Sequence, residues 1–174
     1  MANPSPITLV LGGARSGKSR YAESLVTAFP TPWLYVATAV AGDAEMAARI
    51  AEHCARRGDG WRVMEAPRDV AGAIVSAPAG NAVLVDCLTL WLSNLMLADA
   101  DIPSEAGRLD RALAEARGPV VLVSNEVGFG IVPDNALARR FRDAQGRLNQ
   151  QVAARASRVV LMVAGLPLVV KGTP

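Results

Sequence analysis

Short apolar runs alternate along the chain with longer stretches in which apolar residues recur at helical spacing. Most of the runs are nearly continuous in Val, Leu and Ile, which is typical of strands covered on both faces. The spacers between them are long enough for crossover helices, so the pattern predicts a parallel sheet with right-handed connections. The predicted strands are Ile7–Leu11, Trp33–Ala37, Ala82–Val85, Val120–Val123, Val159–Val163 and Leu168–Lys171.

The stretches between these runs predict helices, and polar residues in front of some of them are suited to capping. Asp43, Ser104 and Asp134 are the predicted N-caps. The segment Gly165-Leu166-Pro167 predicts a tight turn that adds an antiparallel edge strand, and Ala98–Ser104 predicts a surface loop. The predicted helices are Lys18–Ala28, Ala44–Arg57, Arg68–Ser76, Leu88–Ala98, Ser104–Arg117 and Asn135–Ala156.

A glycine-rich segment lies between the first predicted strand and the first predicted helix. Its sequence, Gly12-Gly13-Ala14-Arg15-Ser16-Gly17-Lys18-Ser19, fits the pattern G-x-x-x-x-G-K-[ST]. Glycines let backbone N–H groups turn inward around a polyphosphate, and the helix N-terminus adds positive potential. Lys18 is predicted to reach the β- and γ-phosphates and Ser19 to ligate Mg²⁺. The alternative is a chance Lys-Ser in a Gly-rich turn, which the flanking strand and helix disfavour, so we predict a nucleoside triphosphate site.

Together these features predict an α/β fold of the P-loop NTPase (RecA-like) class. We expect three layers, with helices on both faces of a mostly parallel sheet and an antiparallel C-terminal edge strand. A chain of 174 residues suits one domain, and neither an internal repeat nor a linker divides it. The predicted domain therefore covers residues 1–174.

Polar residues at the ends of two predicted strands extend the candidate site. Asp86 follows Val83-Leu84-Val85, at the carboxyl end of a strand, where open α/β sheets bind ligands. It is predicted to hold Mg²⁺ through water or to hold the Ser19 hydroxyl; the alternative is a helix cap. Asn125 and Glu126 follow another strand on the same rim, and they either orient a reacting hydroxyl or the metal or stabilise a loop.

Composition narrows the classes of partner. The net charge of +2 gives no reason to expect nucleic acid or an anionic membrane, and 5% aromatic residues argue against a base-stacking platform. The apolar stretch Val159–Val170 is broken by Gly165 and Pro167 and is shorter than the roughly 20 residues of a membrane span. Cys54 and Cys87 are too few for a disulfide framework, and the start lacks a signal-peptide pattern, which predicts a cytoplasmic protein.

Two observations argue against a nucleotide-dependent switch or assembly module. The chain lacks the sequence N-K-x-D, so guanine is not read in the way of the switch GTPases. The segment Asp143-Ala144-Gln145-Gly146 matches D-x-x-G but falls within an Arg-rich predicted helix. We interpret it as part of that helix.

The only histidine, His53, lies on the predicted helix Ala44–Arg57 among several arginines. Imidazole is a competent nucleophile toward phosphorus, and covalent catalysis divides a difficult transfer into two steps. A single histidine on an amphipathic helix is, however, also an ordinary packing or surface residue. The residues alone leave both interpretations open.

The chain resembles the bifunctional adenosylcobinamide kinase / adenosylcobinamide-phosphate guanylyltransferase family of cobalamin biosynthesis, from about Ile7 to Lys171. The most specific stretch runs from Val123 to Pro133. The other matching segments are Gly12–Ser19, Tyr35–Ala39, Asp43–His53 with Trp61 and Glu65, Val85–Thr89, Arg139–Asp143 and Gly146–Gln150.

The resemblance implies two reactions and a role for His53. A nucleoside triphosphate, GTP with ATP as the alternative, phosphorylates the aminopropanol hydroxyl of adenosylcobinamide; GTP then guanylylates His53, and GMP passes to adenosylcobinamide phosphate. It also implies a corrinoid-binding homotrimer with catalytic His53 and Lys18. The implied GTP contacts are Gly12 to Ser19, Ala37, Thr38, Ala39, Cys54, Ala55, Arg56, Arg57, Glu65 and Asp86. A kinase with a structural His53 is the remaining enzyme alternative.

Overall fold

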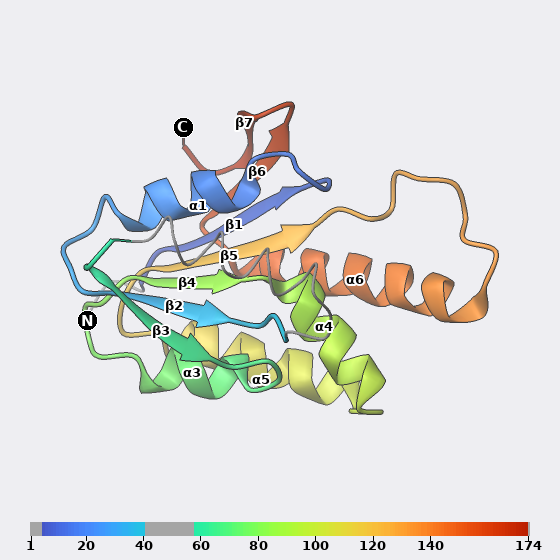
Figure 1. The fold of residues 1–174 in the computed structure, drawn as a ribbon, viewed down its shortest axis with the longest axis horizontal. Helices are drawn as coiled ribbons and strands as arrows, with labels where there is room; N and C mark the ends of the chain where they lie inside the picture. Colours follow the sequence, from blue (N-terminus) through green and yellow to red (C-terminus); the bar gives the residue numbers. More distant parts are fainter. Residues whose placement is uncertain (1–4, 41–57, 174) are drawn as a thin grey trace.

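The structure is a computed structural model that describes residues 5–40 and 58–173. In these residues seven strands form one sheet in the order β3-β2-β4-β5-β1-β6-β7 (Figure 1). All neighbours pair in parallel except β7, which is antiparallel to β6, as predicted. The strands are β1 (Ile7–Gly12), β2 (Trp33–Ala37), β3 (Trp61–Glu65), β4 (Val83–Asp86), β5 (Val120–Asn125), β6 (Arg158–Val163) and β7 (Leu166–Lys171).

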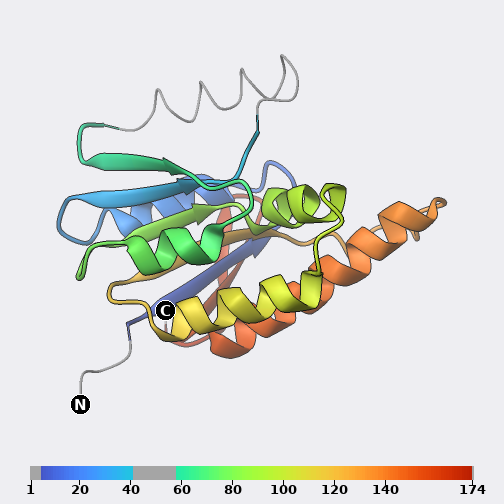
Figure 2. The same cartoon turned by 90° about the horizontal axis from the view of Figure 1, so that it is seen from below.

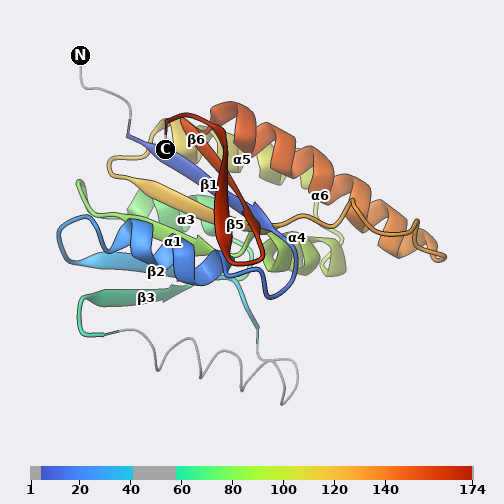
Figure 3. The same ribbon diagram turned by 90° about the horizontal axis from the view of Figure 1, so that it is seen from above.

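Helices cover both faces of the sheet, which gives the three layers that the sequence predicts. Figure 2 shows α3, α4, α5 and α6 together on one face, and Figure 3 shows α1 on the other. The described helices are α1 (Lys18–Val26), α3 (Val70–Ser76), α4 (Leu88–Leu97), α5 (Ile102–Ala114) and α6 (Ala136–Arg155). Among the described residues, none of these helices combines the length and the apolar character that a membrane crossing needs.

The central strands contribute alternate residues to two hydrophobic clusters, one on each face. Leu9 and Leu122 pack in the cluster beneath α3, α4, α5 and α6, whereas Val10 and Val123 pack in the cluster beneath α1. Successive side chains of a strand point to opposite faces, so a strand covered on both sides is apolar throughout. This explains why the central strands were recognisable as continuous apolar runs.

The edge strand β3 (Trp61–Glu65) was not predicted as a strand. It pairs only with β2, and Arg62, Val63 and Glu65 are exposed, so its sequence lacks a continuous apolar run. The Trp61 ring packs against the Trp33 ring with 5.4 Å between the ring centroids. The strand was therefore missed because Arg62 and Glu65, which an exposed edge position tolerates, interrupt its apolar run.

The predicted loop Ala98–Ser104 is wrong in its second half, because α5 begins at Ile102. The N-cap is Asp101, whose carboxylate accepts a hydrogen bond from the Ser104 N–H at 3.1 Å. Ser104 is therefore inside the first turn and is not the cap. Both residue types are good caps, and spacing alone does not decide between them.

The other predicted caps have different outcomes. The N-cap of α6 is Asn135, whose side-chain oxygen accepts from the Ala138 N–H at 2.7 Å; the predicted cap, Asp134, precedes it by one residue. Asp43 and the predicted helix Ala44–Arg57 lie outside the described residues.

The turn between β6 and β7 also differs from the prediction. Ala164 has φ 51° and Gly165 has φ 82°, and β7 begins at Leu166. A two-residue hairpin turn of type I′ requires positive φ at both central positions. The turn is therefore Ala164-Gly165, and Leu166 and Pro167 already belong to the strand.

Candidate nucleotide-binding site

The predicted phosphate loop connects β1 to α1, and the backbone requires two of its three glycines, Gly12 and Gly17. Gly12 has φ 153°, and a Cβ there would lie 2.8 Å from the Met162 carbonyl oxygen. Gly17 is the N-cap of α1 with φ 92°, a left-handed conformation that suits glycine. The loop therefore turns directly into the helix N-terminus, where backbone N–H groups are available to an anion.

Lys18 is the first residue of α1, and its side chain is held inside the loop. Only 8% of Lys18 is exposed, and its Nζ donates a hydrogen bond to the Gly13 carbonyl at 2.5 Å. Burial lowers the pKa of Lys18, whereas the neighbouring Cys87 and Asp86 raise it. Ser16 Oγ is also buried in the loop, without a hydrogen-bond partner among the described residues. A buried ammonium and an unsatisfied hydroxyl are groups that phosphate oxygens would satisfy.

Asp86 lies at the carboxyl end of β4, on the same rim as the phosphate loop. Its backbone is in register with Ala37 of β2 and with Val123 of β5. Tyr35 Oη donates to Asp86 Oδ2 at 3.1 Å, and Tyr35 is itself buried. This hydrogen bond orients the carboxylate that is predicted to serve the metal.

Within the described part of the chain there is no group of three or more His, Cys, Asp or Glu that would form a metal site on its own. Mg²⁺, however, is commonly held by one or two carboxylates together with substrate phosphates and water. Asp86, on the rim beside Lys18, and the orphaned Ser16 hydroxyl fit a site of that kind. The residues present therefore suit Mg²⁺ that arrives with a nucleotide.

Thr38 has a structural task that the sequence did not show. Its side chain is fully buried, and Oγ1 donates to the Cys87 carbonyl at 2.8 Å and accepts from the Cys87 N–H at 2.7 Å. Asn94 Nδ2 donates to the Thr38 carbonyl at 2.8 Å and to the Pro67 carbonyl at 2.9 Å. The hydroxyl of Thr38 is thus engaged with the residue that follows Asp86.

Cys87 is not a candidate nucleophile. Burial, together with the nearby Asp86 carboxylate, raises the pKa of the Cys87 thiol to about 11. The reactive form of cysteine is the thiolate, and a raised pKa disfavours that form near neutral pH.

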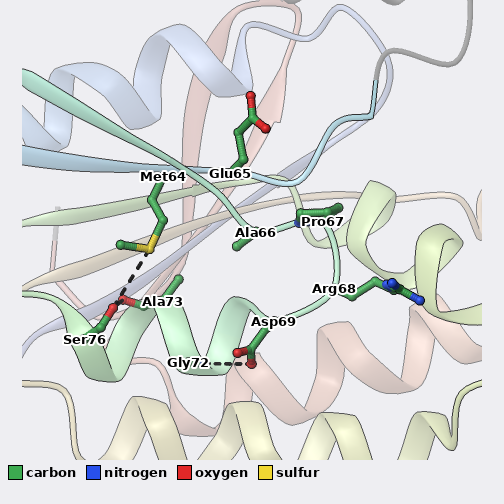
Figure 4. A pocket seen from close by; sticks show the side chains of 9 residues that line it. All are labelled: Met64, Glu65, Ala66, Pro67, Arg68, Asp69, Gly72, Ala73 and Ser76. Atoms are coloured by element: carbon green, nitrogen blue, oxygen red, sulfur yellow. Dashed lines mark hydrogen bonds between the residues drawn. The ribbon is translucent and has the colours of Figure 1, made fainter.

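Glu65 ends β3 and is in register with Ala37, which places it on the same rim but at the edge of the sheet. An open pocket of about 490 Å³ lies beside it, lined by residues 64–69 and by Gly72, Ala73 and Ser76. In Figure 4 the Glu65 side chain points away from Met64, which reaches toward Ser76 of α3. The pocket and the phosphate loop therefore lie at different places in the fold.

Asn125 is the last residue of β5, and Glu126 follows it. The Glu126 carboxylate accepts the Gly128 N–H at 2.6 Å, and the Glu126 N–H donates to the Gly12 carbonyl at 3.0 Å. These bonds stabilise the loop, which was one of the two interpretations of Glu126. Asn125 lies next to Gly12 across the β1–β5 pair.

The phosphate loop, Ala37, Thr38 and Asp86 thus lie on one rim, with Glu65 at its edge, and Ala39 follows Thr38 directly in the chain. His53, Cys54, Ala55, Arg56 and Arg57 lie outside the described residues. Sequence reasoning missed Tyr35 and Asn94 as supporting residues. Their signal was a polar group inside an apolar segment, since buried tyrosine hydroxyls and amides need hydrogen-bond partners.

The parallel sheet, the glycine-rich loop with its buried lysine and the carboxylate on the same rim define a P-loop nucleotide-binding protein. Solved structures share this fold. An ATPase from the type III secretion system of pathogenic bacteria has a TM-score of 0.57 and 11% identity. The match covers 94% of this chain and 56% of the ATPase chain. The RadB recombinase has a TM-score of 0.52 and 15% identity, and the match covers 91% of this chain and 74% of the recombinase chain. The RecA-like P-loop fold is therefore confirmed, and these likenesses show the fold alone.

The chain belongs to the cobinamide kinase / cobinamide phosphate guanyltransferase family, whose sequence profile matches residues 8–170. It is similar to the bifunctional adenosylcobalamin biosynthesis protein CobP of Pseudomonas aeruginosa, with 51% identity over 95% of this chain and 98% of the relative. It is also 42% identical to the bifunctional adenosylcobalamin biosynthesis protein CobU of Salmonella typhimurium, over 94% of this chain and 98% of the relative. The predicted family is confirmed, and membership identifies the chain as an enzyme of a family with kinase and guanyltransferase activities.

Proposed function

We propose that this chain carries out both reactions of its family on corrinoid substrates. The first transfers the γ-phosphoryl group of a nucleoside triphosphate to the aminopropanol hydroxyl of adenosylcobinamide. The second transfers GMP from GTP, through His53, to adenosylcobinamide phosphate and gives adenosylcobinamide-GDP. The observation that carries the proposal is the buried Lys18 ammonium, held inside the phosphate loop on the same rim as Asp86.

In the first reaction the hydroxyl oxygen attacks the γ-phosphorus, the bond to the β,γ-bridging oxygen breaks, a nucleoside diphosphate leaves, and the hydroxyl proton is released to water. Phosphoryl transfer is mainly positioning and charge neutralisation. Lys18 neutralises charge on the β- and γ-phosphates, and the N-terminus of α1 supplies N–H donors. Mg²⁺, held by Ser19 and Asp86, supplies further charge neutralisation when it is bound.

In the second reaction an imidazole nitrogen of His53 attacks the α-phosphorus of GTP and pyrophosphate leaves. A phosphate oxygen of adenosylcobinamide phosphate then attacks the same phosphorus, and the His53–phosphorus bond breaks. Relatives that are described as bifunctional support this half, and His53 is the only histidine in the chain. We propose that Ala37 to Ala39, Cys54 to Arg57 and Glu65 contact GTP in this step.

We further propose that residues 1–174 act as one domain in a cytoplasmic homotrimer. Large apolar side chains are exposed on the segment after β5 and on β7, among them Phe129, Ile131, Leu166 and Leu168. Exposed apolar patches are typical of protein–protein contacts. Sedimentation analysis of the purified chain tests the trimer, and a monomer at micromolar concentration contradicts it.

The proposed function is tested by incubating the purified chain with Mg²⁺ and GTP labelled at the α-phosphate, followed by denaturing electrophoresis and peptide mass spectrometry. We expect a GMP adduct on His53 that is labile to acid and stable to alkali, as a phosphoramidate is. In His53→Asn the adduct is expected to disappear while phosphorylation of adenosylcobinamide from γ-labelled nucleotide continues. Full guanylyl transfer by His53→Asn contradicts the covalent route, and phosphorylation without any adduct in the wild type favours a kinase alone.

A further inference from the structure

A small cluster of buried polar side chains joins α6 to the end of β5. We call Ser124, Gln145 and Asn149 the polar cluster; their exposed fractions are 0%, 0% and 6%. Ser124 Oγ donates to Asn149 Oδ1 at 2.7 Å, and Gln145 Nε2 donates both to Ser124 Oγ at 2.9 Å and to Asn149 Oδ1 at 3.0 Å. Each side chain is thus bonded to the other two, which fixes their relative positions.

The polar cluster holds the backbone of Asn125, the last residue of β5. Asn149 Nδ2 donates to the Asn125 carbonyl at 3.0 Å, and Thr89 Oγ1 of α4 accepts the Asn125 N–H at 2.8 Å. The next N–H, that of Glu126, donates to Gly12 of the phosphate loop at 3.0 Å. Asn125 is therefore fixed by α6, by α4 and, through its neighbour, by the phosphate loop.

In the sheet, Asn125 lies between the start of the phosphate loop at Gly12 and the carboxylate Asp86. Figure 1 shows β5 between β1, which ends at Gly12, and β4, which ends at Asp86. Ser124 points toward α6, so by strand alternation the Asn125 side chain belongs to the opposite face. That face is covered by α1, the helix that begins with Lys18.

The polar cluster carries a cost that an apolar core would avoid. Gln145 Oε1 is buried and has no hydrogen-bond partner among the described residues. An unpaired buried acceptor is destabilising, and an apolar side chain of similar size would pack at the same place without that penalty. The polar side chains of the cluster can fix the end of β5 by hydrogen bonds, which apolar side chains could not do.

We propose that the polar cluster and Thr89 position the Asn125 carboxamide against the transferring γ-phosphoryl group. The inference rests on the kinase half of the proposed function. Asn125 is a catalytic residue whose Nδ2 donates to a phosphoryl oxygen as charge develops there, and Gln145 and Asn149 are its positioning residues. Donors that are held in place before the reaction stabilise a transition state without reorganising.

The test compares Gln145→Met in the full chain with Gln150→Met, because Gln150 is exposed on the same helix. In Gln145→Met the kcat for phosphorylating adenosylcobinamide is expected to fall about tenfold, with the nucleotide KM within about twofold and the thermal midpoint unchanged or higher. Formation of the GMP adduct on His53 is expected to stay within about twofold, since that step attacks a different phosphorus. Gln150→Met is expected to change none of these quantities.

A double-mutant cycle with Asn125→Ala distinguishes positioning from packing. If Gln145 acts through Asn125, Gln145→Met/Asn125→Ala is no slower than Asn125→Ala alone; independent effects would multiply. Unchanged kinase kcat in Gln145→Met, or parallel loss of thermal midpoint and of both reactions, overturns the inference. A wild-type chain that forms the GMP adduct but does not phosphorylate adenosylcobinamide contradicts the kinase half of the proposed function, and the inference falls with it.

Discussion

The centre of the rim and its edge at β3 are supported in different ways. In the centre, β1, β5 and β4 each have a neighbour on both sides, and their ends are tied to one another and to α4 and α6. At the edge, β3 pairs only with β2, and its end is held by hydrogen bonds from α4 to the carbonyls of Pro67 and Arg68. The difference teaches that the proposed phosphate-binding part of the site is supported by strands on both sides, whereas the part that contains Glu65 is supported by β2 on one side and by α4.

The largest expected effect comes from Lys18→Met, which removes the charge at the centre. Both proposed reactions use the triphosphate, so we expect each kcat to fall about a hundredfold or more. Rates with γ-labelled and α-labelled GTP measure the two losses. The matched control is Lys171→Met at the other lysine, which is exposed on β7. Loss of only one reaction would mean that the two reactions do not share this phosphate site.

A smaller effect, mainly on guanylyl transfer, is expected from Asn94→Leu, which loosens the segments after β2 and β3. The variant removes the hydrogen bonds to the Thr38 and Pro67 carbonyls. We expect the free energy of unfolding to fall by about 1–2 kcal/mol and guanylyl transfer to slow about tenfold, with the kinase kcat changed much less. Urea unfolding and the two kinetic assays measure these quantities. Equal loss of both reactions would remove the distinction between centre and edge.

The smallest effect is expected from Tyr35→Phe, at the strand between the two regions. The variant deletes the hydrogen bond to Asp86 Oδ2 and leaves the ring in place. Residues that orient a metal ligand tune its affinity, so we expect the Mg²⁺ concentration at half-maximal kinase rate to rise about threefold to tenfold. Tyr21→Phe, at the other tyrosine, is the control. No shift in the Mg²⁺ requirement would contradict the proposed metal role of Asp86.

The sequence predicted the central strands well because burial on both faces leaves one clear signal, a continuous apolar run. It missed β3 because charged residues interrupt the apolar run of that edge strand, and it misplaced the start of α5 because Asp101 and Ser104 are both competent caps. These errors have one cause, since local pattern does not reveal which tertiary neighbour a segment will meet.

The candidate site shows the same limit. The glycine-rich loop and Asp86 were predictable because their chemistry is local to a strand end. The D-x-x-G segment at Asp143 was correctly interpreted as helical, since it lies within α6, yet its Gln145 is fully buried against β5. The spacing of apolar residues identified the helix, but not that Ser124 lies opposite it.

The hydrogen bonds of α4 connect the centre of the rim to its edge. Thr89, Trp91 and Asn94 of this one helix bond the end of β5, the segment after β3 and the segment after β2. A ligand that displaced α4 at one of these places would disturb its hydrogen bonds at the others. By thermodynamic linkage the influence is reciprocal, with the same coupling free energy in both directions.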